Sequence, residues 1–308
     1  MKDKFIVTAA ITGAIHTPTM SPYLPITSDE IVEEAGRASD AGAAVVHIHA
    51  RDPEEGKPFG TPEMFSELLP RIKTRSSAVI CTTTGGALGQ TAEQRVAVVK
   101  RFSPELASLN AGSMNFAIFP ALDKFKDFKY EWEPEYLGMT EDFIFPNTFK
   151  TLKQFSRHFK KEGTKPEFEV YDVGMLSNLA FLVEKGFIQK PLYLQFVLGI
   201  LGGMPATVGN LMFLLNTAKE LFGNEFIWSV CAAGREQFRM CNLALIMGGN
   251  ARVGLEDNLY LEKGVKAKSN GEQVEKIIRM GRELGLEPAT PDEARTILGL
   301  KGLDKVKY

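Results

Sequence analysis

Eight short apolar runs recur along the 308-residue chain, and segments with helical patterns separate them. The runs are the expected strands and cover residues 5–12, 43–49, 78–84, 105–111, 167–171, 193–198, 226–231 and 251–255. Strands that alternate with helices form parallel sheets whose faces are covered by those helices. Eight β-then-α units in one chain of this size predict an α/β fold, a (β/α)₈ TIM barrel, in preference to a doubly wound sheet.

The segments between the strands carry start and stop signals of helices. Thr27 or Ser28 is the expected N-cap of the first helix, and Pro62 stands at the first position of the second. The expected helices cover residues 31–41, 62–73, 90–101, 147–161, 175–185, 207–221 and 236–247, with additional C-terminal helices at 271–284 and 291–298. Residues 114–146 are expected to form an extended loop. Since no linker or internal repeat interrupts the pattern, we expect residues 1–308 to form a single TIM-barrel domain.

Two histidines lie two residues apart in the second expected strand, which reads VVHIHARD at residues 45–52. Side chains at positions i and i+2 of a strand point to the same face, so His47 and His49 project side by side. The alternative is a pair of core histidines, which would need hydrogen-bond partners for four ring nitrogens. Two imidazoles at this spacing instead favour a divalent metal, and imidazole suits zinc, iron, copper or nickel. Such a site needs at least one more ligand.

Polar residues end several of the expected strands. In a TIM barrel the chemistry takes place at the carboxyl ends of the strands, so these residues are the candidates for a functional site. They are Thr83 in strand three, Ser108 and Asn110 in strand four, Glu169 in strand five, and Arg252, Glu256 and Asp257 in and after strand eight.

Strand eight supplies the missing ligand in this interpretation. In a closed barrel the eighth strand lies beside the first, and the second lies next to that, so Glu256 can reach a metal held by the two histidines. Arg252 and Glu256 share a face if the strand continues with period two. A buried Arg needs an acidic partner, and Glu256 or Asp257 is the nearest carboxylate in sequence. Two His and one carboxylate leave coordination positions open, as in catalytic zinc sites.

Several of these residues also have a structural interpretation. Arg252 and Asp257 can form a purely structural ion pair, and Glu169 can be an interior charge with a partner elsewhere in the barrel. Gly202 and Gly203 belong either to a turn or to a cradle for a phosphate or pantetheine group. His16 is expected to be structural.

Charge and composition exclude two classes of partner. A net charge of −2 provides no basic footprint for nucleic acid. No apolar run approaches the ~20 residues that a membrane-spanning helix needs. Cys81, Cys231 and Cys241 are few and lack CxxC spacing, which indicates a reducing compartment. The first apolar segment is too short for a signal peptide, so we expect a cytoplasmic protein.

Seven motifs, in order along the chain, together resemble those of the β-keto acid cleavage enzymes, the family that includes 3-keto-5-aminohexanoate cleavage enzyme. They are TAAITGA at residues 8–14, VVHIHARD at 45–52, TTGGALG at 83–89, ASLNAGSMNF at 107–116, PEFEVYDVGM at 166–175, LQFVLGILGGM at 194–204 and RVGLEDNLY at 252–260. The resemblance implies a zinc-dependent TIM barrel that condenses a β-keto acid with acetyl-CoA, giving acetoacetate and a new acyl-CoA. It also implies a homo-oligomer, often a tetramer.

The resemblance implies a role for each candidate residue. The metal ligands would be His47, His49 and Glu256, and the pair that activates the base would be Arg252 and Asp257. The keto acid would contact Thr83, Ser108 and Glu169. We place Asn110 and Ile15 in the same substrate pocket, and we expect Gly202 and Gly203 to bind the CoA moiety.

Two positions depart from the aminohexanoate branch of this family. That branch has an acidic residue after TGA, which suits an amino group, whereas this chain has Ile15. Ile offers nothing to an ammonium group, so the expected substrate is an uncharged β-keto acid that lacks the amino group. Thr83 stands where that branch has Ser, which keeps the hydroxyl and adds a methyl group.

Two other functions are compatible with the residues. One is a metal-dependent aldolase or C–C hydrolase that does not use CoA. The other is a non-catalytic, metal-bound ligand sensor on a barrel scaffold. The Arg252–Asp257 pair argues against the sensor, because binding alone does not need a base.

Overall fold

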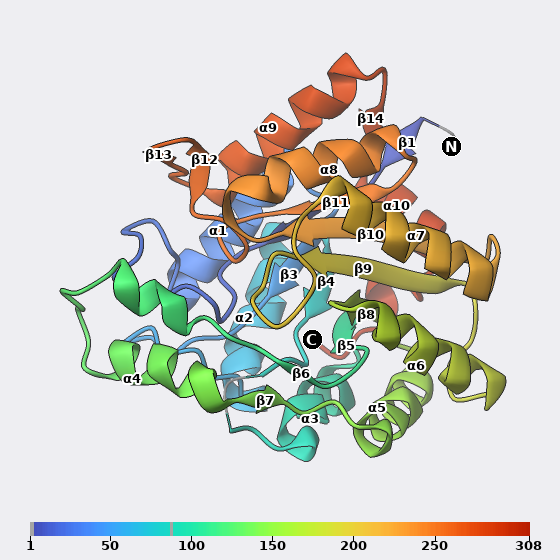
Figure 1. Ribbon diagram of the computed structural model, residues 1–308, viewed down its shortest axis with the longest axis horizontal. Coiled ribbons are helices and arrows are strands. Elements are labelled where there is room, and N and C mark those ends of the chain that lie inside the picture. Colours follow the sequence, from blue (N-terminus) through green and yellow to red (C-terminus); the bar gives the residue numbers. More distant parts are fainter. Residues whose placement is uncertain (1–2, 87–88) are drawn as a thin grey trace.

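The computed structural model describes residues 3–86 and 89–308 and shows a closed barrel of eight parallel strands (Figure 1). Ala87 and Leu88 of the TTGGALG motif lie outside the described residues. Around the barrel the strands are β2 (Val7–Ala10), β3 (Val45–Ile48), β4 (Val79–Thr82), β5 (Leu106–Asn110), β8 (Lys165–Val170), β9 (Leu192–Leu198), β10 (Phe226–Ala232) and β11 (Asn250–Val253). Because β11 pairs with β2, the predicted TIM barrel is confirmed, including the contact between its eighth and first strands.

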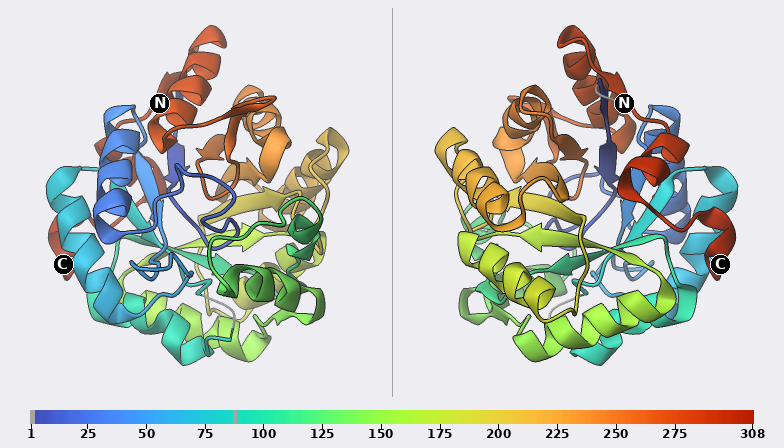
Figure 2. Two further views of the ribbon diagram at one scale, coloured as in Figure 1. Left: turned by 90° about the vertical axis from the view of Figure 1, so that its left-hand side faces the viewer. Right: turned by 90° about the vertical axis from the view of Figure 1, so that its right-hand side faces the viewer.

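Helices surround the strands on all sides (Figure 2). They are α1 (Ser28–Asp40), α2 (Pro62–Arg75), α3 (Ala92–Phe102), α5 (Phe149–Glu162), α6 (Val173–Glu184), α7 (Val208–Phe222) and α8 (Gln237–Ile246). Thr27 caps α1 in a capping box with Glu30, and Pro62 is at the first turn of α2, as predicted. Within the described residues, no helix combines the length and the apolar character that crossing a bilayer requires.

The two C-terminal helices have different places in the barrel. Helix α9 (Asn270–Glu283) packs between α8 and α1, so it completes the ring as the helix that follows β11. Helix α10 (Pro291–Leu298) places Ala294 and Leu298 against Val45, Val79 and Leu106. These contacts close the end of the barrel opposite to the carboxyl ends of the strands.

The segment between β5 and α5, expected to be an extended loop, contains regular structure. A short hairpin of β6 (Met114–Asn115) and β7 (Ile144–Phe145) encloses the helices η1 (Phe119–Asp123), α4 (Trp132–Gly138) and η2 (Met139–Asp142) (Figure 1). Trp132, Tyr136 and Leu137 of α4 pack with Leu255 and Leu259, which follow β11. The aromatic residues of this segment thus form a small core of their own above the barrel.

The first and last expected strands are shorter in the structure. Residues 5–12 divide into β1 (Lys4–Phe5), which pairs with β14 (Glu287–Pro288), and the barrel strand β2. Strand β11 ends at Val253, before Gly254, whose φ is +142°. The hairpin of β12 (Tyr260–Glu262) and β13 (Val265–Lys266) has no counterpart among the expected elements.

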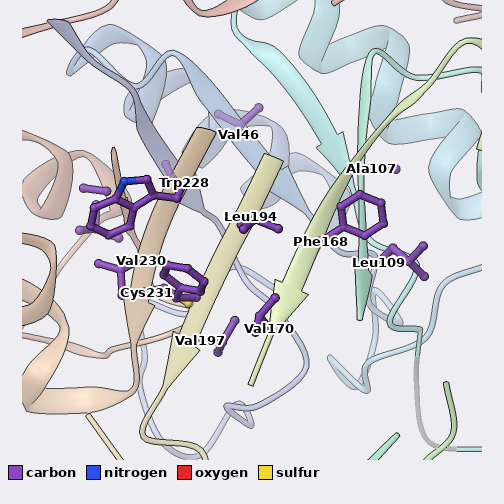
Figure 3. Close-up of a cluster of buried hydrophobic side chains, with 14 of the residues drawn as sticks. Val46, Ala107, Leu109, Phe168, Val170, Leu194, Val197, Trp228, Val230 and Cys231 are labelled. Carbon is purple, nitrogen blue, oxygen red and sulfur yellow. The ribbon is translucent and has the colours of Figure 1, made fainter. Parts of the chain in front are cut away.

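Alternation along the strands separates an apolar exterior from a polar interior of the barrel. Phe168, Leu194 and Val230 belong to the main core (Figure 3). The intervening positions carry polar side chains that are also fully buried, such as Gln195 and Ser229, which hydrogen-bond to each other at 2.6 Å. The exterior residues stabilise the fold by burial of apolar surface, which leaves the interior available for polar groups.

Leu194→Ala tests the energetic role of this core. The side chain is completely buried, so its truncation should lower the free energy of unfolding by about 2–5 kcal/mol. Leu284 is 42% exposed, and Leu284→Ala should change it by no more than about 0.5 kcal/mol. Chemical denaturation of both variants measures the difference, and equal effects would contradict the assignment of the core.

Candidate active site

Three predicted metal ligands meet at the mouth of the barrel. His47 Nε2 lies 3.6 Å from Glu256 Oε2, and His49 Nε2 lies 3.5 Å from Glu256 Oε1. The ligand atoms of these three buried side chains lie within 4.8 Å of one another. Two ligands of a tetrahedral zinc ion, with bonds of ~2.1 Å, are roughly 3.4 Å apart. The three residues therefore form a group that can hold a first-row metal ion.

Glu256 reaches this position through a tight turn, and the expected period-two continuation of strand eight is wrong. A Cβ at Gly254 would overlap the backbone of Ala10, so the chain after β11 packs directly on β2. The backbone N–H of Glu256 then donates to Ala10 O at 3.1 Å. Gly13 has a φ of +60°, and an added Cβ there would overlap the side chain of Glu256. Two glycines with no predicted role thus make room for the carboxylate.

The chemical state of the donor set also fits a metal ion. Burial, with the nearby Arg252 charge, lowers the pKa of His47 well below its usual value and the pKa of His49 to about 3. Both imidazoles are therefore neutral near pH 7 and have a lone pair to offer. Glu256 Oε2 is buried and has no hydrogen-bond partner within the described ranges. A divalent cation would satisfy that oxygen.

Arg252 connects this group to two further carboxylates. Its Nε and one terminal nitrogen donate to Asp257 Oδ2 and Oδ1 at 2.9 and 3.0 Å. The same terminal nitrogen donates to Glu256 Oε1 at 2.7 Å, and the other donates to Glu169 Oε1 at 3.2 Å. The predicted Arg252–Asp257 contact is present, and Arg252 is also the partner that the sequence leaves unnamed for Glu169.

A cavity of about 730 Å³, part of it open to solvent, joins these groups. One half is polar and is lined by His49, Thr83, Asn110, Glu169, Arg252, Glu256 and Asp257. The other half is mainly apolar and includes Ile15, Phe116, Ile118, Phe143 and Phe145. The barrel strands and the turns after them supply the polar wall, whereas the segment between β5 and α5 supplies much of the apolar one.

Two polar side chains in the wall have hydrogen atoms to donate. Asn110 Nδ2 is buried and makes no hydrogen bond to the described part of the chain. Thr83 Oγ1 accepts from the backbone N–H of Gly85 at 2.9 Å, which leaves its own hydrogen for another acceptor. A carboxylate or carbonyl oxygen in the cavity could accept from both.

Ser108 and the glycine pair lie away from the cavity wall. Ser108 pairs in register with Glu167, one inward-facing position below Asn110, and does not line the cavity. A Cβ at Gly202 would overlap the backbone of Asn115, so the loop after β9 packs closely on the segment after β5. The predicted contacts of Ser108 with a keto acid, and of Gly202 and Gly203 with CoA, stay predictions.

Arg51 is a structural residue of the site for which no role is predicted from sequence. It is only 3% exposed, and its hydrogen bonds go to neutral oxygens, namely Thr12 Oγ1, Thr12 O, His16 O and Gly56 O, at 2.6–2.9 Å. These bonds fix the chain on both sides of Ile15. Its position in the apolar VVHIHARD run is the one signal that pointed to a buried cation. His16 Nδ1 contacts Leu255 O at 2.9 Å, consistent with its expected structural role.

Comparisons with known proteins agree along the whole chain. A family model described as beta-keto acid cleavage enzyme matches residues 4–300. The chain is 46% identical over 307 residues to a 3,5-dioxohexanoate:acetyl-CoA acetone transferase of Paraburkholderia graminis, covering 100% of this chain and 99% of that one. It is 42% identical over 299 residues to a 3-keto-5-aminohexanoate cleavage enzyme of Acetoanaerobium sticklandii, covering 97% and 99%. The solved apo structure of ObcA shares the fold, with a TM-score of 0.73 at 23% identity over 91% of this chain and 66% of that chain.

Gly13→Ala tests whether the space above Glu256 is needed. Gly163 has nearly the same φ, +61°, at the end of α5, where an added Cβ would lie 3.7 Å from the Lys301 side chain. Each substitution to Ala should cost about 1 kcal/mol of backbone strain. In Gly13→Ala alone the zinc affinity, measured by competition with a chelator, should also fall at least about tenfold, because Glu256 is displaced. Equal zinc affinities in the two variants would contradict this role.

Glu169→Gln tests the electrostatics of the polar wall. Burial, partly opposed by Arg252, raises the pKa of Glu169 to about 8 from the ordinary value of 4.5. Between these values the folded state holds more protons than the unfolded state, so Glu169 reduces stability as the pH rises. In the metal-free protein, the stability of Glu169→Gln relative to the natural chain should rise from pH 5 to pH 9, by about 1 kcal/mol or more.

The control for this measurement is Glu184, whose side chain is 69% exposed. Glu184→Gln should show no comparable pH-dependent gain. A flat difference between pH 5 and pH 9 for Glu169→Gln would show that Glu169 ionises normally.

Proposed function

The chain belongs to the beta-keto acid cleavage enzyme family, and on that basis we propose that it transfers the acyl group of a β-keto acid with an uncharged substituent to CoA. In the reaction R–CO–CH₂–COO⁻ reacts with acetyl-CoA, and the products are R–CO–CoA and acetoacetate. The observation that carries the proposal is the Arg252-held Asp257 beside the His47, His49 and Glu256 group, of which His49 and Glu256 line the same cavity as Asp257.

Asp257 is the proposed base. The two hydrogen bonds from Arg252 fix the carboxylate and favour its charged form, although burial raises its pKa above the ordinary value. A raised pKa makes the carboxylate a better proton acceptor at neutral pH. In this role Asp257 removes a proton, directly or through water, from the carbon between the two carbonyl groups of the keto acid. That carbon then attacks the thioester carbonyl of acetyl-CoA and displaces CoA thiolate. The thiolate attacks the original β-keto carbonyl, the bond from that carbonyl to the central carbon breaks, and R–CO–CoA is released. The central carbon takes back the proton from Asp257, which gives acetoacetate.

A divalent metal held by His47, His49 and Glu256, for which zinc is our proposal, would supply Lewis-acid polarisation of the β-keto oxygen. Asn110 Nδ2 and Thr83 Oγ1 have hydrogen atoms to donate on the same wall, and they are the proposed partners of the substrate carboxylate. Glu169, with its raised pKa, adds a largely protonated carboxyl group near neutral pH. The polar half thus matches a β-keto acid at its reacting end.

The apolar half of the cavity supports a substrate with an uncharged substituent. Two hydroxyl groups at this end are already engaged, because Tyr136 donates to Ala14 O at 2.8 Å and Thr140 donates to Leu137 O at 2.7 Å. The guanidinium of Arg95 lies 4.6 Å from the centre of the Phe145 ring, and this positive charge disfavours a second cation nearby. Among the described residues of this wall, Ile15 itself offers an ammonium group no polar partner.

The alternatives differ from this proposal in their products. A retro-aldol or hydrolytic enzyme would cleave the keto acid without forming acyl-CoA. The relatives named as transferases and cleavage enzymes favour an enzyme over a ligand sensor. We further propose that CoA contacts the Gly202–Gly203 loop and that the chain acts as one catalytic domain in a homo-oligomer. In this proposal it works in the cytoplasm, without nucleic-acid or membrane partners.

Asp257→Asn tests the proposed chemistry. The metal-analysed protein is incubated with acetyl-CoA and a panel of β-keto acids, and acetoacetate and acyl-CoA are followed. The natural chain should form both products from neutral keto acids. Asp257→Asn should keep its zinc and lose roughly 10²–10⁴-fold in kcat, because the base is removed. Unchanged turnover in this variant would disprove the assigned role, and cleavage without acyl-CoA would favour the aldolase or hydrolase.

Ile15→Glu tests the proposed substrate class. A carboxylate at this position should lower kcat/KM for neutral keto acids about tenfold or more, because it is desolvated in an apolar wall. It should at the same time raise activity on 3-keto-5-aminohexanoate, whose ammonium group would then have a partner. Ile15→Leu is the matched control and should retain the preference for neutral substrates. Faster turnover of the amino substrate by the natural chain would contradict the proposal.

A further inference from the structure

One ring nitrogen of His47 is left without a partner by the site described above. Nε2 faces Glu256, whereas Nδ1 is buried and makes no hydrogen bond to any described residue. A neutral imidazole carries one N–H, and a nitrogen that binds a metal has to be the unprotonated one. When Nε2 serves as the ligand, the proton is therefore on Nδ1, where it needs a buried acceptor.

Cys81 and Glu167 lie beside His47 inside the barrel. Ligand atoms of the three side chains lie within 4.8 Å of one another, and all three residues are buried. Cys81 is the register neighbour of His47 on β4, and Glu167 comes from β8. The Cys81 thiol donates to Glu167 Oε1 at 3.7 Å, and its sulfur is only a weak acceptor for the His47 N–H. Glu167 Oε2 is buried and has no partner in the described part of the chain.

We propose that Glu167 is a positioning residue of the metal centre, and that its Oε2 accepts the Nδ1–H of His47, directly or through one water. Metal-binding histidines in proteins almost always donate their second N–H to such an acceptor, which fixes the tautomer and the ring orientation and makes the ligand more basic. The proposal rests on the metal role given to His47 in the proposed function.

The surroundings of Glu167 are suited to a bridging water. Tyr193 is its register neighbour on β9, and the buried hydroxyl group of Tyr193 interacts with Glu167 and with the buried hydroxyl group of Thr8. An internal water needs about two to four polar partners. His47 Nδ1, Glu167 Oε2 and these hydroxyls belong to one polar layer in the barrel interior and supply that number.

The two predicted histidine ligands differ in their exposure to the cavity. The side chain of His49 is 11% exposed and lines the cavity, so solvent or substrate can contact it. The side chain of His47 is 1% exposed and does not line the cavity. A group inside the barrel therefore has to orient His47, and Glu167 is the acidic residue grouped with it apart from Glu256, which faces Nε2.

Zinc affinity, measured by competition with a chelator, tests the proposal without reference to turnover. Glu167→Leu removes the acceptor at similar volume and should weaken zinc binding about 10–100-fold. Glu167→Gln keeps a neutral acceptor and should weaken it less. Cys81→Ala is the matched control, because it removes the contact to Oε1 and leaves Oε2 in place, and its affinity should stay within about threefold of the natural chain. Thermal unfolding of each metal-free variant reports its folding.

Several outcomes would overturn the proposal. One is a folded Glu167→Leu variant that holds one zinc per chain and binds it as tightly as the natural chain does. Another is an equal loss in Cys81→Ala, which would indicate altered packing. A third is two zinc ions in the natural chain and one in Glu167→Leu, which would make His47, Cys81 and Glu167 a metal site of their own. If Glu167→Leu does not fold, a Glu167→Gln variant that binds zinc as tightly as the natural chain does would overturn the proposal.

The proposed function fails in a distinguishable way. A natural chain that binds zinc, responds to Glu167→Leu as expected and forms no acetoacetate would contradict the reaction and leave the role of Glu167 supported.

Discussion

Arg252 donates hydrogen bonds to Glu169, Glu256 and Asp257, and the polar wall of the cavity depends on this arrangement. Three carboxyl groups in a dry interior repel one another, and burial alone disfavours the charge on each of them. One guanidinium, with its donors fixed in a plane, offsets part of that repulsion and holds each carboxyl group in a defined orientation. A metal ion on the histidines would add positive charge on the other side of Glu256, so that this carboxylate would lie between two cations.

The barrel separates stability from chemistry by the alternation of its strands. On β8, Phe168 and Val170 pack outward into the core, whereas Glu167 and Glu169 point inward. The outward residues bury the apolar area that keeps the fold stable. The interior can then hold polar groups that contribute little to stability. A separate segment, between β5 and α5, supplies much of the apolar wall of the cavity.

The barrel, its strand order and the paired histidines were predictable because each follows from a short sequence period. Hydrophobic runs at regular intervals indicate the strands, and period two places His47 and His49 on one face. The position of Glu256 was predicted from strand adjacency, but the route to it was not, because β11 stops at Val253 and the turn at Gly254 has no periodic signal.

Long-range contacts explain the other features that were not predicted from the sequence. The helices within residues 114–146 are short, and α4 is stabilised by packing against residues that follow β11, which a local pattern does not reveal. Arg51 was visible as a charge in an apolar run, yet three of its four neutral acceptors belong to Thr12 and His16, which are far from it in sequence. Ser108 and Asn110 share a face of β5, and only the structure shows that the cavity reaches Asn110 alone.

The hydrogen bonds of Arg51 have a consequence for how such a protein can acquire new substrates. They tie the backbone around Ile15 to the end of the strand that carries the two histidines, so the frame at position 15 does not depend on the side chain placed there. Under the role proposed for Ile15, recognition at this point is separable from the reaction centre. A single codon change would then alter which compound is accepted while the catalytic apparatus stays in place, and divergence of specificity within one scaffold would require no redesign of its chemistry.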